Sequence, residues 1–152
     1  MGHEPDNQSH GGMVTLYTPL NYSYARIIRQ AIVDLCVHAG MSEFKTAQFE
    51  MAVDEASSLI FSAQERAAPE IRDAALPGEL SVRLYQDGDQ VVVELCHGGE
   101  PLEMGESASP ENWFGEDDLE ATGLFVIRRF VDGLSYQRGT PLGHCLRMSK
   151  KK

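Results

Sequence analysis

The fold is indicated most clearly by the stretch Glu120-Ala-Thr-Gly-Leu-Phe-Val-Ile-Arg-Arg-Phe-Val-Asp-Gly-Leu-Ser-Tyr-Gln-Arg-Gly-Thr140. Gly123 provides a turn, and apolar residues then recur at helical spacing from Leu124 to Val131. An Asp-Gly pair stops this helix, and Leu134 begins a run of alternating residues. The stretch therefore predicts a glycine turn, a helix of about two turns and the first strand of a closing hairpin.

Upstream of this stretch, the sequence predicts two longer helices. Pro19 and Asn21 precede the first helix, and Gly40 ends it as a left-handed cap. Ser42 and Lys45 open the second helix. The apolar stripe of the first helix consists of Tyr24, Ile27, Ile28, Ala31, Leu35 and Cys36, and that of the second consists of Phe49, Ala52, Val53, Ala56, Leu59, Ile60 and Ala63.

Strands account for most of the remaining pattern. Met13–Tyr17 is a short strand, and an Asp87-Gly88 turn joins Leu80–Tyr85 to Val91–Leu95 as a hairpin. His144–Met148 closes the C-terminal hairpin. These elements predict an α+β two-layer sandwich, with helices on one face of a mixed, mostly antiparallel sheet.

Three polar segments lie outside these elements. Met1–Gly12 is expected to be a flexible arm, and Arg66–Gly78 a loop. His97–Glu120 is rich in glycine, proline and acids, which is typical of a lid. Residues 13–150 are accordingly expected to form a single domain.

Charge and composition exclude several functions. A net charge of −10 over 152 residues argues against nucleic-acid binding and suits a basic protein partner. The only basic run, Lys150–Lys152, is interpreted as a solvated terminus. There is no apolar run long enough for a membrane span and no signal sequence, so we expect a cytoplasmic protein.

The three cysteines give no metal or disulfide signature. They are odd in number and lack C-x-x-C spacing, so they are expected to be buried small hydrophobes. His97 follows Cys96, and His144 precedes Cys145, but neighbours on a strand point to opposite faces. A metal site is therefore not expected.

The glycine turn and closing hairpin resemble the second glycine box of the anti-sigma-factor serine kinases, a branch of the Bergerat-fold (GHKL) ATPases. The helix carrying Glu55-Ala-Ser-Ser-Leu59 resembles the N-box of that family, and Cys96-His-Gly98 falls where its Asp-x-Gly box lies. The resemblance extends from about Met13 to Lys150 and implies the same sandwich fold.

The resemblance gives the helix residues specific roles. In the family, a glutamate polarises the attacking hydroxyl, and an asparagine four residues later helps to hold magnesium. Glu55 matches the catalytic glutamate, but Leu59 replaces the asparagine and offers no oxygen to a hard cation. Without that ligand, Glu55 is interpreted as a solvated acid or an internal hydrogen-bond acceptor.

The resemblance also places the nucleotide contacts. Cys96 stands where an aspartate accepts the adenine amino group, while Gly98 keeps the glycine of that box. Ala121 replaces a phosphate-loop glycine, which leaves the helix start at Thr122, Gly123 and Leu124 as a weak anion site or an ordinary capped N-terminus. Thr140 matches a threonine near the adenine edge, although a turn residue explains it equally well.

The expected lid contains Trp113 and Phe114 among acidic residues. These aromatic side chains either fill an empty nucleotide pocket or anchor a partner protein.

The sequence supports three hypotheses about function. The first is an anti-sigma-factor-like regulator that binds proteins in a bacterial partner-switching pathway, with ATP binding weakened or lost. The resemblance implies a sigma factor, a STAS-type antagonist, or both as partners, and a possible homodimer. The second is an active serine kinase that uses ATP and magnesium to phosphorylate such an antagonist. The third is a sensor that binds another small ligand in the vacated pocket.

Overall fold

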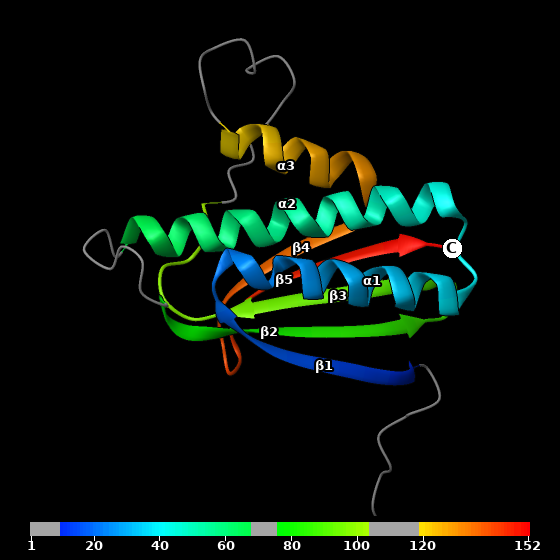
Figure 1. Ribbon diagram of the computed structural model, residues 1–152, viewed down its shortest axis with the longest axis horizontal. Helices are drawn as coiled ribbons and strands as arrows, with labels where there is room; N and C mark the ends of the chain where they lie inside the picture. The colour runs from blue at the N-terminus through cyan, green and yellow to red at the C-terminus, as the bar shows by residue number, and fades with distance from the viewer. Residues whose placement is uncertain (1–9, 68–75, 104–118) are drawn as a thin grey trace, which may run out of the picture.

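The computed structural model describes residues 10–67, 76–103 and 119–152 (Figure 1). Its helices are α1 (Ala25–Ala39), α2 (Glu43–Ala67) and α3 (Leu119–Phe130), and a short 3₁₀ turn, Tyr22–Tyr24, precedes α1. Its strands are β1 (His10–Leu20), β2 (Leu76–Asp87), β3 (Gln90–His97), β4 (Gly133–Thr140) and β5 (Gly143–Lys151). None of the helices in these ranges is long and apolar enough to cross a membrane.

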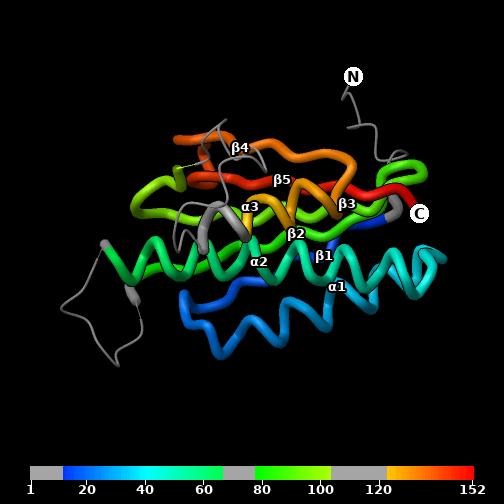
Figure 2. Tube along the Cα trace, turned by 90° about the horizontal axis from the view of Figure 1, so that it is seen from above, coloured from blue at the N-terminus to red at the C-terminus, as the bar shows by residue number. Residues whose placement is uncertain are grey.

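The strands form one five-stranded sheet in the order β1-β2-β3-β5-β4. Each neighbouring pair is antiparallel, so the described sheet is antiparallel throughout rather than mixed. The helices lie together on one side of the sheet, as Figure 2 shows from above. The predicted α+β sandwich is therefore confirmed.

Alternation along β3 separates the two faces of the sheet. Val91, Val93 and Leu95 belong to the core cluster under the helices. Between them, Val92, Glu94 and Cys96 face the opposite side, because successive strand residues point to opposite faces. We call that side the helix-free face. From the neighbouring strands it also carries Ser81, Arg83, Tyr85, Ser135, Gln137, Cys145, Arg147 and Ser149.

The predicted helix signals are confirmed. Gly40 caps α1 with φ of 84°, and its N–H donates to the carbonyls of Cys36 and Val37. The hydroxyl of Ser42 accepts the N–H of Lys45 at 3.2 Å at the start of α2. Within the α1 stripe, however, Ile27 is exposed rather than packed in the core.

Several predicted boundaries differ from the structure. Residues 10–12 belong to β1, although the sequence placed them in a flexible arm, and β2 already begins at Leu76. Residues 1–9 lie outside the described ranges. The α3 helix begins at Leu119, well before the predicted Leu124.

Lys150 is not part of a solvated tail. It lies in β5 with a nearly buried side chain, and its Nζ donates to the carbonyl of Phe130 at 2.6 Å. Because this carbonyl belongs to the last residue of α3, the ammonium group ties the end of the helix to the sheet.

Two phenylalanines on α2 test the assigned core. Phe49 is fully buried and Phe44 is 74% exposed. Phe49→Ala should lower the free energy of unfolding by about 3–5 kcal/mol, because it leaves a cavity under the helix. The matched control Phe44→Ala should change it by less than about 0.5 kcal/mol. Urea denaturation followed by circular dichroism measures both, and equal losses would contradict the assigned packing.

Candidate functional site

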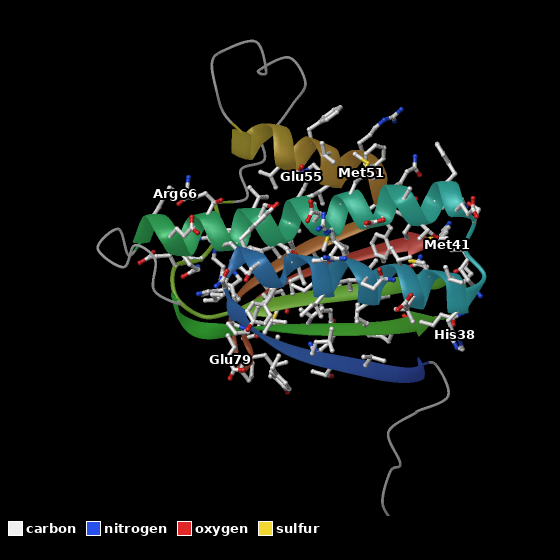
Figure 3. All side chains as sticks on the ribbon, viewed as in Figure 1. His38, Met41, Met51, Glu55, Arg66 and Glu79 are labelled. Carbon is white, nitrogen blue, oxygen red and sulfur yellow. A yellow bond between two sulfur atoms is a disulfide. The ribbon has the colours of Figure 1, made fainter. Side chains whose placement is uncertain are left out.

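Three of the predicted site residues meet where α3 crosses α2. A Cβ atom on Gly123 would lie 3.1 Å from Oε2 of Glu55 and 3.7 Å from Cδ2 of Leu59. In Figure 3, Glu55 lies on the side of α2 that faces α3. The absence of a side chain at Gly123 therefore lets the two helices approach closely, with the Glu55 carboxylate at their contact.

The start of α3 differs from the predicted phosphate loop. Thr122, Gly123 and Leu124 lie inside the helix, which begins at Leu119. Thr122 is therefore not its N-cap, and the N–H of Gly123 falls within the i to i−4 ladder instead of being free for a phosphate. Leu124 is buried, as the alternative of an ordinary packed helix requires.

Cys96 is not positioned to recognise adenine on the helix side of the sheet. It forms a disulfide with Cys145, directly opposite on β5, and both side chains lie on the helix-free face. The expectation that all three cysteines are free is therefore wrong. Only Cys36 is free, as a buried thiol on α1.

The residue that faces the helices at the end of β3 is His97. Its side chain is 1% exposed, and its Nε2 is 3.1 Å from the hydroxyl of Tyr136. The N–H of Leu102 donates to the same hydroxyl at 2.8 Å. The Tyr136 proton is then available to Nε2, and Nδ1 carries a proton that it donates to the carbonyl of Gly98 at 2.8 Å. Because a carbonyl oxygen can only accept, the contact with Gly98 places a proton on Nδ1.

The loop after His97 is held by the same group of side chains. Gln64 of α2 donates to the carbonyl of Glu100 at 3.0 Å, and Arg138 of β4 donates to that of Leu102 at 3.0 Å. His144 lies against His97 and contacts the carbonyl of Gly99 through Nε2 at 3.0 Å. The start of the predicted lid, which includes Gly98, is thus anchored from α2, β4 and β5.

Burial lowers the pKa of His97, and the neighbouring His144 adds to the effect. The hydrogen bond to the Gly98 carbonyl opposes it. The lowered pKa favours the neutral imidazole in the folded protein.

Thr140 is placed as the alternative explanation predicted. Its hydroxyl donates to the carbonyl of Gly143 at 2.7 Å and accepts the N–H of Leu142 at 3.2 Å, which closes the turn between β4 and β5. It is also 3.4 Å from the sulfur of Cys145 on the helix-free face. Thr140 and Cys96 are thus separated by the sheet from Glu55, Leu59 and Gly123.

Leu59 of α2 directs apolar atoms toward Gly123 of α3 at the position where the resemblance implies a magnesium ligand, and Oε2 of Glu55 lies 3.1 Å from the place that a Cβ atom on Gly123 would take. Within residues 10–67, 76–103 and 119–152, no group of three or more His, Cys, Asp or Glu is placed to hold a metal ion. Trp113 and Phe114 of the predicted lid lie outside these ranges.

The arrangement of three helices on a five-stranded antiparallel sheet is that of the GHKL ATPases. Residues 18–150 match the histidine kinase-like ATPase domain, and the chain belongs to this family. A search of curated proteins found no match.

Sequence reasoning missed the cluster of His97, Gln64 and Tyr136. The signal was present, because the alternation of Val91, Val93 and Leu95 continues to His97. Extending this period by one step would have placed His97, and not Cys96, on the helix side. Gln64 carried no such signal, since its contacts come from the loop that folds back toward α2.

The neutral state of His97 predicts a pH-dependent stability. Because its folded pKa lies below the unfolded value of about 6.5, the unfolded chain binds more protons in that interval. The stability that comes from the neutral His97 is fully present above about pH 6.5 and is lost as the pH falls toward the folded pKa. The melting temperature should therefore decrease as the pH is lowered from about 7.5 to about 5.5. His97→Gln should flatten this slope, while His38→Gln, at an exposed site, should not. Equal slopes in all three proteins would contradict the assignment.

Proposed function

We propose that this protein is an anti-sigma-type regulator that works by binding other proteins, with nucleotide binding weakened or lost. The observation that carries the proposal is the contact of α3 with α2 at Gly123. There, the Leu59 side chain occupies the position of the metal ligand expected from the resemblance, and the helix backbone approaches the Glu55 carboxylate. Phosphoryl transfer depends chiefly on metal-assisted charge neutralisation, which these groups do not provide.

Exposed apolar side chains on α2 support a role in protein binding. Phe44 is 74% exposed and Met51 is 52% exposed. They lie seven residues apart on one helix, which places them on the same side. An apolar surface that these two side chains form together would suit an interface with another protein.

The net charge of −10 favours a basic partner, because complementary charge speeds encounter and excludes other acidic proteins. The candidate partners are a sigma factor and a STAS-type antagonist, and a second copy of the chain remains a candidate for a homodimer. Binding to a sigma factor would place the protein in transcription regulation by partner switching.

An active serine kinase is the second candidate function. It is favoured by the position of Glu55, which is half-buried at the contact with α3 where a general base of this family would act. This function requires α3 to move away from α2 when nucleotide binds. It also requires a magnesium ligand from the part of the chain outside the described residues.

Nucleotide binding is tested by thermal unfolding with and without magnesium-ATP. A site with a dissociation constant of about 10 μM would gain about 2.7 kcal/mol at about 1 mM nucleotide, and a site weaker than about 1 mM would gain less than about 0.4 kcal/mol. Wild-type protein should show almost no shift relative to magnesium alone. The double variant Leu59→Asn, His97→Asp places oxygen ligands on the helix side and should gain an ATP-dependent shift.

A shift of several degrees in the wild type would contradict the loss of nucleotide binding. Incubation with a candidate antagonist then decides between the two functions. Stoichiometric phosphate on the antagonist by intact mass, abolished by Glu55→Gln, would establish the kinase and exclude a purely binding regulator.

Partner binding is tested with Phe44→Ala and Met51→Ala, measured by calorimetric titration against purified sigma factors and STAS-type antagonists. Each substitution should weaken binding by about 1–2 kcal/mol if these side chains are anchors, with an unchanged melting temperature. Glu43→Ala, at a neighbouring exposed position, is the matched control. Unaltered affinity in both variants would exclude this surface of α2 from the interface.

A further inference from the structure

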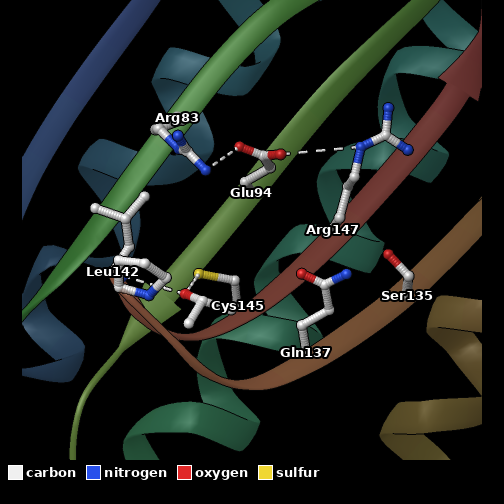
Figure 4. Close-up of a pocket in the computed structure, with 9 residues that line it drawn as sticks. Arg83, Glu94, Ser135, Gln137, Leu142, Cys145 and Arg147 are labelled. Atoms are coloured by element: carbon white, nitrogen blue, oxygen red, sulfur yellow. Dashed lines mark hydrogen bonds and ion pairs between the residues drawn. The ribbon is translucent and has the colours of Figure 1, made fainter.

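The helix-free face contains a cavity that no step of the proposed regulator uses. Its volume is about 470 Å³. Among the lining residues drawn in Figure 4 is Cys145, whose sulfur is bonded to Cys96 of β3. Its lining combines two arginines, one glutamate, polar side chains and a cystine sulfur, namely Arg83, Arg147, Glu94, Ser135, Gln137 and Cys145. A space of this size suits a small molecule of peptide-like dimensions.

We propose that this cavity binds a low-molecular-weight thiol that carries both carboxylate and ammonium groups, as glutathione does, and that this thiol exchanges with the disulfide at Cys145. The proposal does not depend on the function assigned above, because the cavity and the contact between α2 and α3 lie on opposite faces of the sheet.

The charged groups match such a ligand. Arg83 pairs with Glu94 at 2.6 Å, while the Nε of Arg147 is 3.9 Å from the same carboxylate, which is longer than a hydrogen bond. The Arg147 side chain, which also interacts with Tyr85, is 39% exposed, and its guanidinium has further N–H donors that can meet a carboxylate in the cavity. The Glu94 carboxylate, which also accepts the Tyr85 hydroxyl at 3.2 Å, adds the opposite charge to the lining. These charged side chains favour a ligand with charged groups over an apolar thiol.

The accessible sulfur is that of Cys145. It lines the cavity and is half-buried, whereas Cys96 is 1% exposed. A thiolate attacks a disulfide sulfur on the side opposite the leaving sulfur. Since β5 lies between β3 and β4, that side faces Gln137, the residue paired with Cys145 on β4. Gln137 and Ser135 line the cavity there, so the approach path lies within it.

The exchange is balanced without a further oxidant. The ligand thiolate forms a bond to the Cys145 sulfur, the Cys145–Cys96 bond breaks, and Cys96 leaves as a thiolate that takes up a proton. The product is a mixed disulfide at Cys145. Attack of the Cys96 thiolate on the same sulfur reverses the step and releases the small thiol.

The first test measures how fast the wild-type disulfide opens. Oxidised protein is exposed to glutathione or to 2-mercaptoethanol at equal thiolate concentration, free thiols are alkylated, and their number is read by intact mass. Glutathione should open the disulfide about tenfold faster, because charge-assisted hydrogen bonds hold it in the cavity. Arg147→Gln should remove this advantage, while Arg26→Gln, the same charge change on exposed α1, should keep it.

The second test captures the mixed disulfide. In Cys96→Ser, glutathione disulfide should modify Cys145, and peptide mapping should find Cys36 unmodified because burial raises the pKa of this thiol to about 11. Arg147→Gln in this background should slow the modification by about tenfold, without slowing that by uncharged hydroxyethyl disulfide. If Cys96→Ser does not fold, the wild-type rates decide alone.

The proposal is overturned if oxidised wild-type protein retains three free thiols, if both small thiols open the disulfide equally fast, or if the adduct forms on Cys96. A glutathione advantage that persists in Arg147→Gln also overturns it, since the selectivity would then come from outside the cavity.

Discussion

The pairing of β3 on both edges is the constraint on which the rest of the structure depends. From Gln90 to His97, each residue of this strand has a partner on β2 and another on β5. A strand held in this way cannot shift by one residue without moving every side chain to the other face of the sheet. Its alternation therefore decides what enters the core under the helices and what reaches the helix-free face.

The fixed register of β3 places the His97 group on the helix side of the sheet and the disulfide on the helix-free face. Leu95 and His97 face α2, so the loop that leaves β3 is anchored to Gln64 and Tyr136 on the helix side. Between them, Cys96 is directed to the helix-free face and meets Cys145. Two chemically different sites thus lie back to back, separated by the thickness of one strand. Substitutions in one need not disturb the other, as long as the register is kept.

The order of the elements and the fold class could be predicted from sequence because they depend on local patterns. The helical stripes, Gly40 and the two hairpin turns are signals within a few residues. The site was harder to predict because it depends on register and on contacts distant in sequence. The family's Asp-x-Gly box was aligned to Cys96-His-Gly98, which puts its aspartate position at Cys96, while the alternation of the strand assigns the helix side to His97.

The other errors have similar physical causes. The start of α3 was placed at a glycine, since glycine is expected at a helix end, but packing on α2 stabilises the helix through Gly123. Lys150 was assigned to a tail from its charge. Its long side chain is in fact nearly buried, and its ammonium group donates to the carbonyl of Phe130 at the end of α3.

The disulfide also constrains the unfolded chain. Cys96 and Cys145 are separated by 49 positions, and the loop that they close contains the segment after β3, all of α3 and all of β4. In a chain-entropy description, closing a loop of this length lowers the conformational entropy of the unfolded chain and so stabilises the folded state by about 4 kcal/mol. This is a large share of the total stability of a domain of this size. With the disulfide formed, the unfolded second half of the chain has far fewer conformations available than with the two cysteines reduced, although the native contacts are the same in both.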